Sequence, residues 1–201
     1  MKRGLTSVAV LVAITTVLIL APAIALAHPG HADANGLIRG FIHPVTGIDH
    51  VLAIIAVGVL AAQLGGRALW LVPLSFVTVM AFAGALGMAG IRLPFAEVGI
   101  ALSVVVFGLA IAFPLNLSTV ATTALVGFFA LFHGHVHGAE MPGAMSAFPY
   151  AAGFVAATAL LHAIGVGLGL LFGFEGKRFG HRVVQAGGGA MALFGVAILV
   201  S

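Results

Sequence analysis

The sequence contains no cysteine and very little charge. Without cysteine, the chain can form no disulfide or thiolate metal site and can use no thiol catalysis. Charged residues make up 6% of the chain and hydrophobic residues 62%, whereas soluble domains have about 25% charged residues. The mean hydropathy is +1.24, and the formal net charge of +3 is too small and too scattered to indicate nucleic-acid binding. The composition therefore predicts an all-α integral membrane protein.

Residues 1–27 have the pattern of a cleavable signal peptide. Lys2 and Arg3 precede an apolar run from Val8 to Leu20, and Ala25-Leu26-Ala27 provides an A-x-A cleavage site. The alternative is an uncleaved span, because the segment is long enough to cross a membrane. In both cases His28 lies outside the cytoplasm, and cleavage would make it the mature N-terminus.

The remaining residues, 28–201, divide into six apolar stretches at glycine, proline and charged residues. The predicted transmembrane spans are about 44–64, 67–89, 94–113, 117–137, 147–173 and 181–200. With the N-terminus outside, Arg67 and the basic residues 177, 178 and 182 are cytoplasmic, whereas Arg39 and Arg92 are outside. This distribution agrees with the positive-inside rule. We therefore expect a six-helix transmembrane bundle that follows a signal peptide.

Histidine is the most frequent ionisable residue, with nine histidines against five carboxylates. They cluster at residues 28–31, 43–50 and 133–140, within a chain that is otherwise almost wholly apolar. Ionisable groups in a membrane are costly and usually functional. Because the first predicted span begins outside and the fourth ends there, the second and third clusters are expected at the same membrane face.

The second cluster, residues 43–50, reads His-Pro-Val-Thr-Gly-Ile-Asp-His. Pro44 suits the first turn of a helix, which places His43 near the helix start. On a continuous helix the backbones of His43 and His50 would lie about 10 Å apart, too far for both to bind one ion readily. We therefore expect them to be successive positions along a path, with Asp49 either a ligand or a partner that orients an imidazole.

The third cluster places His133 and His137 four residues apart, a spacing that lets two imidazoles on one helix face bind a single metal ion. On a regular helix His135 points elsewhere. Two glycines leave a second arrangement open, in which the segment unwinds and all three imidazoles converge with Glu140. Imidazoles with a carboxylate suit nickel, cobalt, zinc or copper.

Other polar residues have less specific interpretations. His162, deep in the fifth predicted span, is either a metal or proton relay or a packing histidine bonded to a neighbouring helix. His31 and His181 are either ligands or solvated residues at a membrane end, and Glu97 is assigned to a helix N-terminus. Glycines 165, 169 and 173 indicate close packing, which we expect between the fifth and sixth spans.

Together the two motifs resemble those of the HupE/UreJ family of hydrogenase and urease accessory membrane proteins. The family pattern H-P-x-x-G-x-D-H is matched by His43, Pro44, Gly47, Asp49 and His50. The pattern F-H-x-x-A-H-G-x-E is matched by Phe132, His133, His137, Gly138 and Glu140, with Val136 in place of the alanine. The N-terminal His-Pro-Gly-His, the six spans and the length are also similar to that family.

This resemblance implies a permease, not an enzyme, that carries nickel or cobalt across the bacterial inner membrane to supply hydrogenase or urease maturation. The substrate would be a divalent metal ion, with Ni²⁺ first and Co²⁺ or Zn²⁺ as alternatives. Its partners would be the lipid bilayer, the ion and cytoplasmic nickel chaperones. The candidate metal-binding residues are His28, His31, His43, Asp49, His50, His133, His135, His137, Glu140 and His162.

Two other functions stay open at the level of sequence. One is an intramembrane zinc metalloenzyme, in which Glu140 or Asp49 would activate water, although the sequence has no H-E-x-x-H motif. The other is a sensor that binds metal without transporting it. A Walker A motif is also missing from the sequence, so ATP is not expected to drive transport within this chain.

Overall fold

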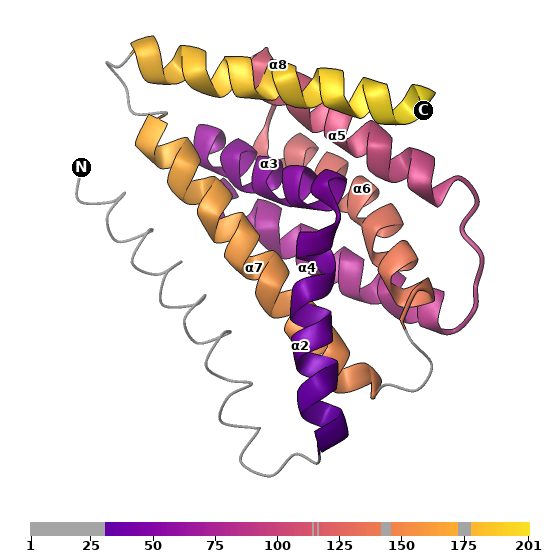
Figure 1. The fold of residues 1–201 in the computed structure, drawn as a ribbon. Helices are drawn as coiled ribbons and strands as arrows, with labels where there is room; N and C mark the ends of the chain where they lie inside the picture. Colours follow the sequence, from indigo (N-terminus) through magenta and orange to yellow (C-terminus); the bar gives the residue numbers. More distant parts are fainter. Residues whose placement is uncertain (1–30, 114, 116, 142–145, 173–177) are drawn as a thin grey trace.

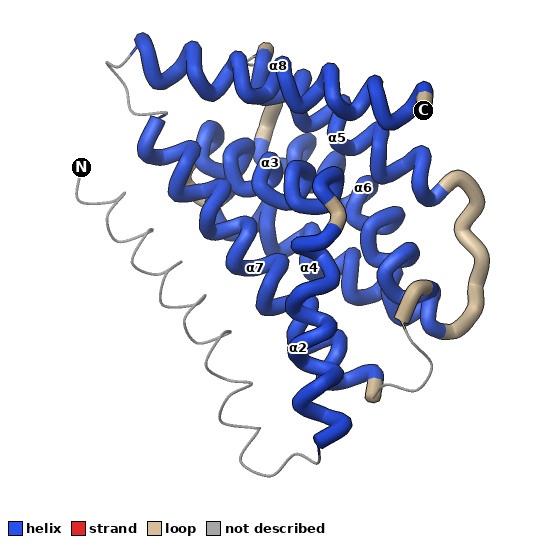
Figure 2. The backbone as a smooth tube through the Cα atoms, in the orientation of Figure 1, coloured by secondary structure: helices blue, strands red, loops and turns tan. Residues whose placement is uncertain are grey.

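The computed structural model describes residues 31–113, 115, 117–141, 146–172 and 178–201. Within these ranges the chain is helical with short connections and has no strand (Figure 2). The predicted signal peptide and His28 lie outside the described residues.

The described helices form a bundle in which each helix packs along at least one other (Figure 1). In chain order they are α2 (His31–Thr46), α3 (Ile48–Leu64), α4 (Ala68–Met88), α5 (Ala96–Ala112), α6 (Thr119–Ala139), α7 (Ala147–Phe172) and α8 (Arg178–Val200).

Four helices, α4, α6, α7 and α8, are each long and apolar enough to cross a membrane. The bent pair α2 and α3 fits either one broken span or a re-entrant loop, and α5 is apolar but has only 17 residues. The chain is therefore a multi-pass membrane protein, and the number of six spans stays a prediction.

The first predicted span, 44–64, is not a continuous helix. It is interrupted at Gly47, where the axes of the flanking helices differ by 85° (Figure 1). Pro44 lies in the last turn of α2, so the expectation that it begins the membrane helix was wrong. A proline inside a helix removes one backbone hydrogen bond, which favours an end close by.

The ends of both helices at this break are stabilised locally. The Thr46 hydroxyl donates a 2.7 Å hydrogen bond to the carbonyl of His43, and Gly47 has extended backbone angles of φ −94° and ψ 115°. In the first turn of α3 the Asp49 carboxylate accepts a 2.8 Å hydrogen bond from the backbone N–H of His50. A carboxylate is favourable at this end of a helix because it complements the helix dipole.

Three closely packed helix pairs build the bundle, namely α4 with α6, α3 with α7, and α5 with α8. In the first pair Gly134 lies against Met80 and Gly138 against Gly84, so these helices run parallel. Contacting residue numbers also rise together along α3 and α7, so these helices are parallel. Along α5 and α8 one number rises as the other falls, so these helices are antiparallel. An up-and-down path through the membrane gives these relative directions.

The glycine stripe of α7 faces a different neighbour from the one expected. Gly165 lies against the backbone of Ile55 and Gly58, and Gly169 lies against Ala62, so the stripe brings α7 close to α3. The predicted packing of this stripe against the last helix was wrong, because α8 uses its own Gly188 to pack on α5. Small residues permit such close backbone approach. Gly173 lies outside the described residues.

Candidate metal-binding site

His137, in the last turn of α6, lies at the point where the two histidine motifs meet. It is buried, with 5% of its surface exposed. Its ring centroid is 4.7 Å from that of His43 and 4.2 Å from that of His50. Neither of its ring nitrogens has a hydrogen-bond partner among the described residues. Buried polar atoms are rarely left unpaired, so this imidazole is a candidate metal ligand.

The break at Gly47 explains how two residues of the first motif reach one histidine. The expectation that His43 and His50 lie far apart assumed a continuous helix, and the 85° bend removes that premise. His43 approaches His137 from the end of α2, and His50 approaches it from the start of α3.

His43, His137 and Glu140 form an outer group. One donor atom from each lies within 4.8 Å of the others, and Nε2 of His43 is 3.3 Å from Oε2 of Glu140. Metal–ligand bonds of about 2.1 Å place donors about 3 to 3.5 Å apart, so donors as far as 4.8 Å apart would have to approach one another by about 1 to 2 Å to bind one ion. The side chain of Glu140 is 53% exposed, which leaves the group accessible from the surface.

His50 and His133 form an inner pair, with ring centroids 4.9 Å apart. Asp49 Oδ1 lies 2.8 Å from Nδ1 of His50, and in the described structure Nε2 of His50 has no partner. A carboxylate that accepts the Nδ1–H leaves the lone pair on Nε2 free to bind a metal. Of the two roles predicted for Asp49, this geometry favours the orienting partner.

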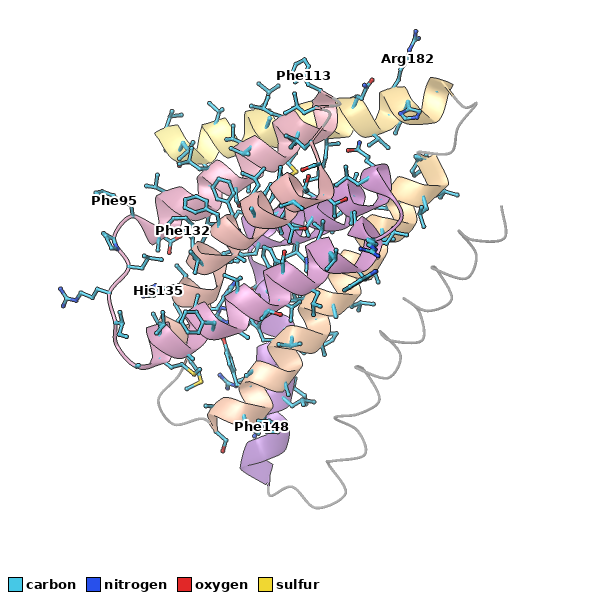
Figure 3. All side chains as sticks on the ribbon, turned by 180° about the vertical axis from the view of Figure 1, so that it is seen from behind. Phe95, Phe113, Phe132, His135, Phe148 and Arg182 are labelled. Atoms are coloured by element: carbon cyan, nitrogen blue, oxygen red, sulfur yellow. The ribbon has the colours of Figure 1, made fainter. Side chains whose placement is uncertain are left out.

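Helix α6 remains regular through Ala139, so the alternative in which this segment unwinds was wrong. His133 and His137 share one face of α6, and both contact His50. His135 points away from them, and its Nε2 bonds the carbonyl oxygen of Ile91 in the segment that follows α4 (Figure 3). The structure therefore does not bring His135 to the site.

His162 lies deeper in the bundle, on α7, with 2% of its surface exposed. Its ring is 5.2 Å from that of Phe76, which is itself 5.4 Å from the ring of His133. Neither nitrogen of His162 has a hydrogen-bond partner in the described part of the chain. The hydrogen bond that the packing interpretation required is therefore not found there.

Several residues near the site were not singled out from the sequence. Phe154 contacts His137 at 4.4 Å between ring centroids, and Tyr150 contacts His43 at 5.9 Å. The Tyr150 hydroxyl is buried without a partner among the described residues. Tyr150 is the only tyrosine of the chain, a signal that sequence reasoning could have used.

A cavity of about 80 Å³ adjoins this site between α4, α6 and α7. Its lining includes His137, Tyr150, Phe154 and Met80. The cavity leaves room beside His137 for movement of the surrounding side chains.

The other predicted candidates lie elsewhere. His31 begins α2, and its side chain is outside the described structure. His181 is exposed on α8, as is Arg182, which extends away from the bundle in Figure 3. Glu97 lies in the first turn of α5, as predicted.

Comparison with known proteins gives a consistent result over nearly the whole chain. Residues 16–198 match the family described as "HupE / UreJ protein". The chain is 50% identical over 189 residues to Protein HupE of Rhizobium leguminosarum bv. viciae, a match that covers 92% of this chain and 96% of the relative. No solved structure matches. These matches confirm the resemblance that the two histidine motifs indicated.

Proposed function

This chain belongs to the HupE/UreJ family, and from that premise we propose that it carries nickel, or else cobalt, across the bacterial inner membrane into the cytoplasm. The family consists of permease-like accessory proteins and not of enzymes. Delivery of the ion to hydrogenase or urease maturation, with nickel chaperones as cytoplasmic partners, belongs to the same proposal.

The observation that carries this proposal is the convergence of both motifs on His137. Two imidazoles from α2 and α3 flank it, and both of its own nitrogens lack partners within the described residues. Imidazole and carboxylate donors suit divalent ions of the nickel and cobalt type. Several donor groups placed one after another in space support passage of an ion better than a single closed site does.

The proposed path starts at the exposed end of the site. The ion would leave water at Glu140 and His43 and bind His137, which belongs to the outer group and also contacts His50 of the inner pair. It would then move to His50 and His133 before reaching the depth of His162. Ligands along such a path must replace the hydration shell yet release the ion readily. Capture by His28 and His31 before this path remains a prediction.

The membrane potential is the proposed driving force. A potential of about 100 mV, negative inside, supplies roughly 4 to 5 kcal/mol for a divalent cation. That energy corresponds to about a thousandfold accumulation at equilibrium. The orientation that this requires, with the histidine clusters outside, is the one predicted by the positive-inside rule.

Flux into liposomes would test the proposal. The purified protein would be reconstituted, an inside-negative potential imposed, and uptake of Ni²⁺, Co²⁺ and Zn²⁺ measured for the unmodified chain, His137→Gln and His135→Gln. His135 and His137 lie on the same helix, but only His137 faces the site. We expect Ni²⁺ uptake that is lost in His137→Gln and retained in His135→Gln.

The same assay separates transport from the second candidate function. A sensor would bind nickel in detergent without moving any ion across the membrane. Binding that is lost in His137→Gln, with no flux in the unmodified chain, would overturn the transport proposal and favour the sensor.

A further inference from the structure

Ser103 is a buried polar residue on α5 that contacts a histidine of the site. It is fully buried, with 0% of its surface exposed. Its Oγ lies 2.6 Å from the carbonyl oxygen of Ile100 and 2.9 Å from Nε2 of His133. The hydroxyl therefore joins the backbone of one helix to an imidazole of another.

The number of available hydrogens decides which atom donates in each contact. A serine hydroxyl has one hydrogen, and a carbonyl oxygen is only an acceptor. If Ser103 donates to Ile100, as their 2.6 Å separation favours, its oxygen is left to accept from Nε2–H of His133. A neutral imidazole with hydrogen on Nε2 has its lone pair on Nδ1.

In this tautomer the lone pair on Nδ1 is available to bind an ion. Nδ1 of His133 is buried and has no partner among the described residues, and the ring lies 4.9 Å from that of His50. Asp49 leaves the lone pair of His50 on Nε2 by the same logic. Each imidazole of the inner pair thus has one nitrogen held by a protein oxygen and one nitrogen without a partner among the described residues.

We propose that Ser103 is a positioning residue that holds His133 in the Nε2–H tautomer, so that Nδ1 is the atom that binds the transported ion. The proposal rests on the proposed function in that the ion is the permeating metal. Partners of this kind fix the tautomer and the ring orientation of metal-binding histidines, and their loss typically costs 10- to 100-fold in metal affinity.

Ser75 provides a matched control. It also lies on a helix of the bundle, and its hydroxyl also bonds the carbonyl three residues earlier, Val72, at 2.8 Å. Its second contact is the backbone carbonyl of Thr123 at 3.3 Å, not a histidine. Ser75→Ala therefore removes a comparable hydroxyl without touching the site.

The test combines side-chain nitrogen NMR with metal binding in detergent. In histidine-labelled protein without metal, His133→Gln identifies the His133 signals, and their shifts report which nitrogen carries hydrogen. We expect Nε2–H in the unmodified chain and in Ser75→Ala, and loss of this single tautomer in Ser103→Ala. Nickel affinity should fall about 10- to 100-fold in Ser103→Ala, and Ser103→Thr should restore both readings because it keeps the hydroxyl.

Two results would overturn the inference. One is hydrogen on Nδ1 of His133 in the unmodified protein, and the other is unchanged nickel affinity in Ser103→Ala. Both measurements are made without flux, so a chain that shows the expected tautomer and affinities but no transport would refute the permease and leave the role of Ser103 intact. Thermal unfolding of all variants distinguishes a lost tautomer from a lost fold.

Discussion

Nε2 of His43 lies 3.3 Å from Oε2 of Glu140. The first residue of one histidine motif therefore pairs with the last residue of the other, although the two are far apart in the sequence. The pair stands at the exposed edge of the site, with His137 directly behind it. A cation that arrives from water would therefore meet a negative charge and an imidazole together before it meets the buried histidines.

Replacing Glu140 should weaken metal binding. Glu140→Gln keeps the shape of the side chain but removes the charge that attracts a divalent ion, and we expect at least about a tenfold loss of nickel affinity. Isothermal titration in detergent measures the change. His181→Gln, an exposed histidine on α8, should leave the affinity unchanged. Equal affinities for Glu140→Gln and the unmodified chain would remove Glu140 from the site.

Alanine at Gly47 should disturb the site without abolishing the bend. The backbone angles of Gly47 are allowed for alanine, but its Cβ would lie 2.9 Å from both Asp49 Oδ1 and His50 Nδ1. We expect this pair to be displaced and nickel affinity to fall about tenfold, with the helical circular dichroism unchanged. Gly167→Ala, where a Cβ meets open space, is the control. Unchanged affinity would mean that the orientation of His50 is unimportant.

A comparison of two glycines on α6 tests the packing that holds His137 in place. A Cβ at Gly138 would overlap the backbone of Gly84, whereas a Cβ at Gly127 would make an ordinary 3.6 Å contact with Val79. We expect Gly138→Ala to lower the free energy of unfolding by about 1 to 3 kcal/mol and Gly127→Ala to have little effect. Denaturant unfolding in detergent measures both. Equal stabilities would show that α4 can move away from α6 at little cost.

Leucine at His162 should change transport and stability in opposite directions. Removing a buried imidazole that has no partner in the described part of the chain relieves a cost of about 1 to 3 kcal/mol, so the variant should be more stable. If His162 is a position on the path, nickel flux should fall at least about tenfold, equivalent to about 1.4 kcal/mol in the barrier. Nickel affinity at the outer group should not change. Higher stability with undiminished flux would make His162 a packing residue.

The sequence predicted the membrane class and the meeting of the two motifs well, because both follow from composition and from the direction of each span. It did not reveal the break at Gly47, since the apolar stretch continues past it and Pro44 suits a helix start. A signal for the break was present, however. A glycine followed two residues later by Asp49, in the first turn of α3, is a typical helix start.

Partners across helices could not be predicted in the same way. Ser103 appears in the sequence as one polar residue in an apolar stretch, and its bond to His133 depends on which face of α5 meets α6. The glycine stripe of α7 was likewise recognised as a packing surface, but a repeat of small residues does not specify which neighbour it faces. Such pairings are set by the arrangement of all the helices and not by local pattern.

Phe76 contacts the rings of both His133 and His162, and it offers no lone pair to an ion on the proposed path between them. Under the proposed function, an ion that passes from His133 to His162 would move beside a ring that cannot bind it, and it would lose one set of ligands before it gains the next. Transport along the proposed path would then saturate with substrate, as it does in a carrier, instead of conducting ions in a continuous file as an open pore does.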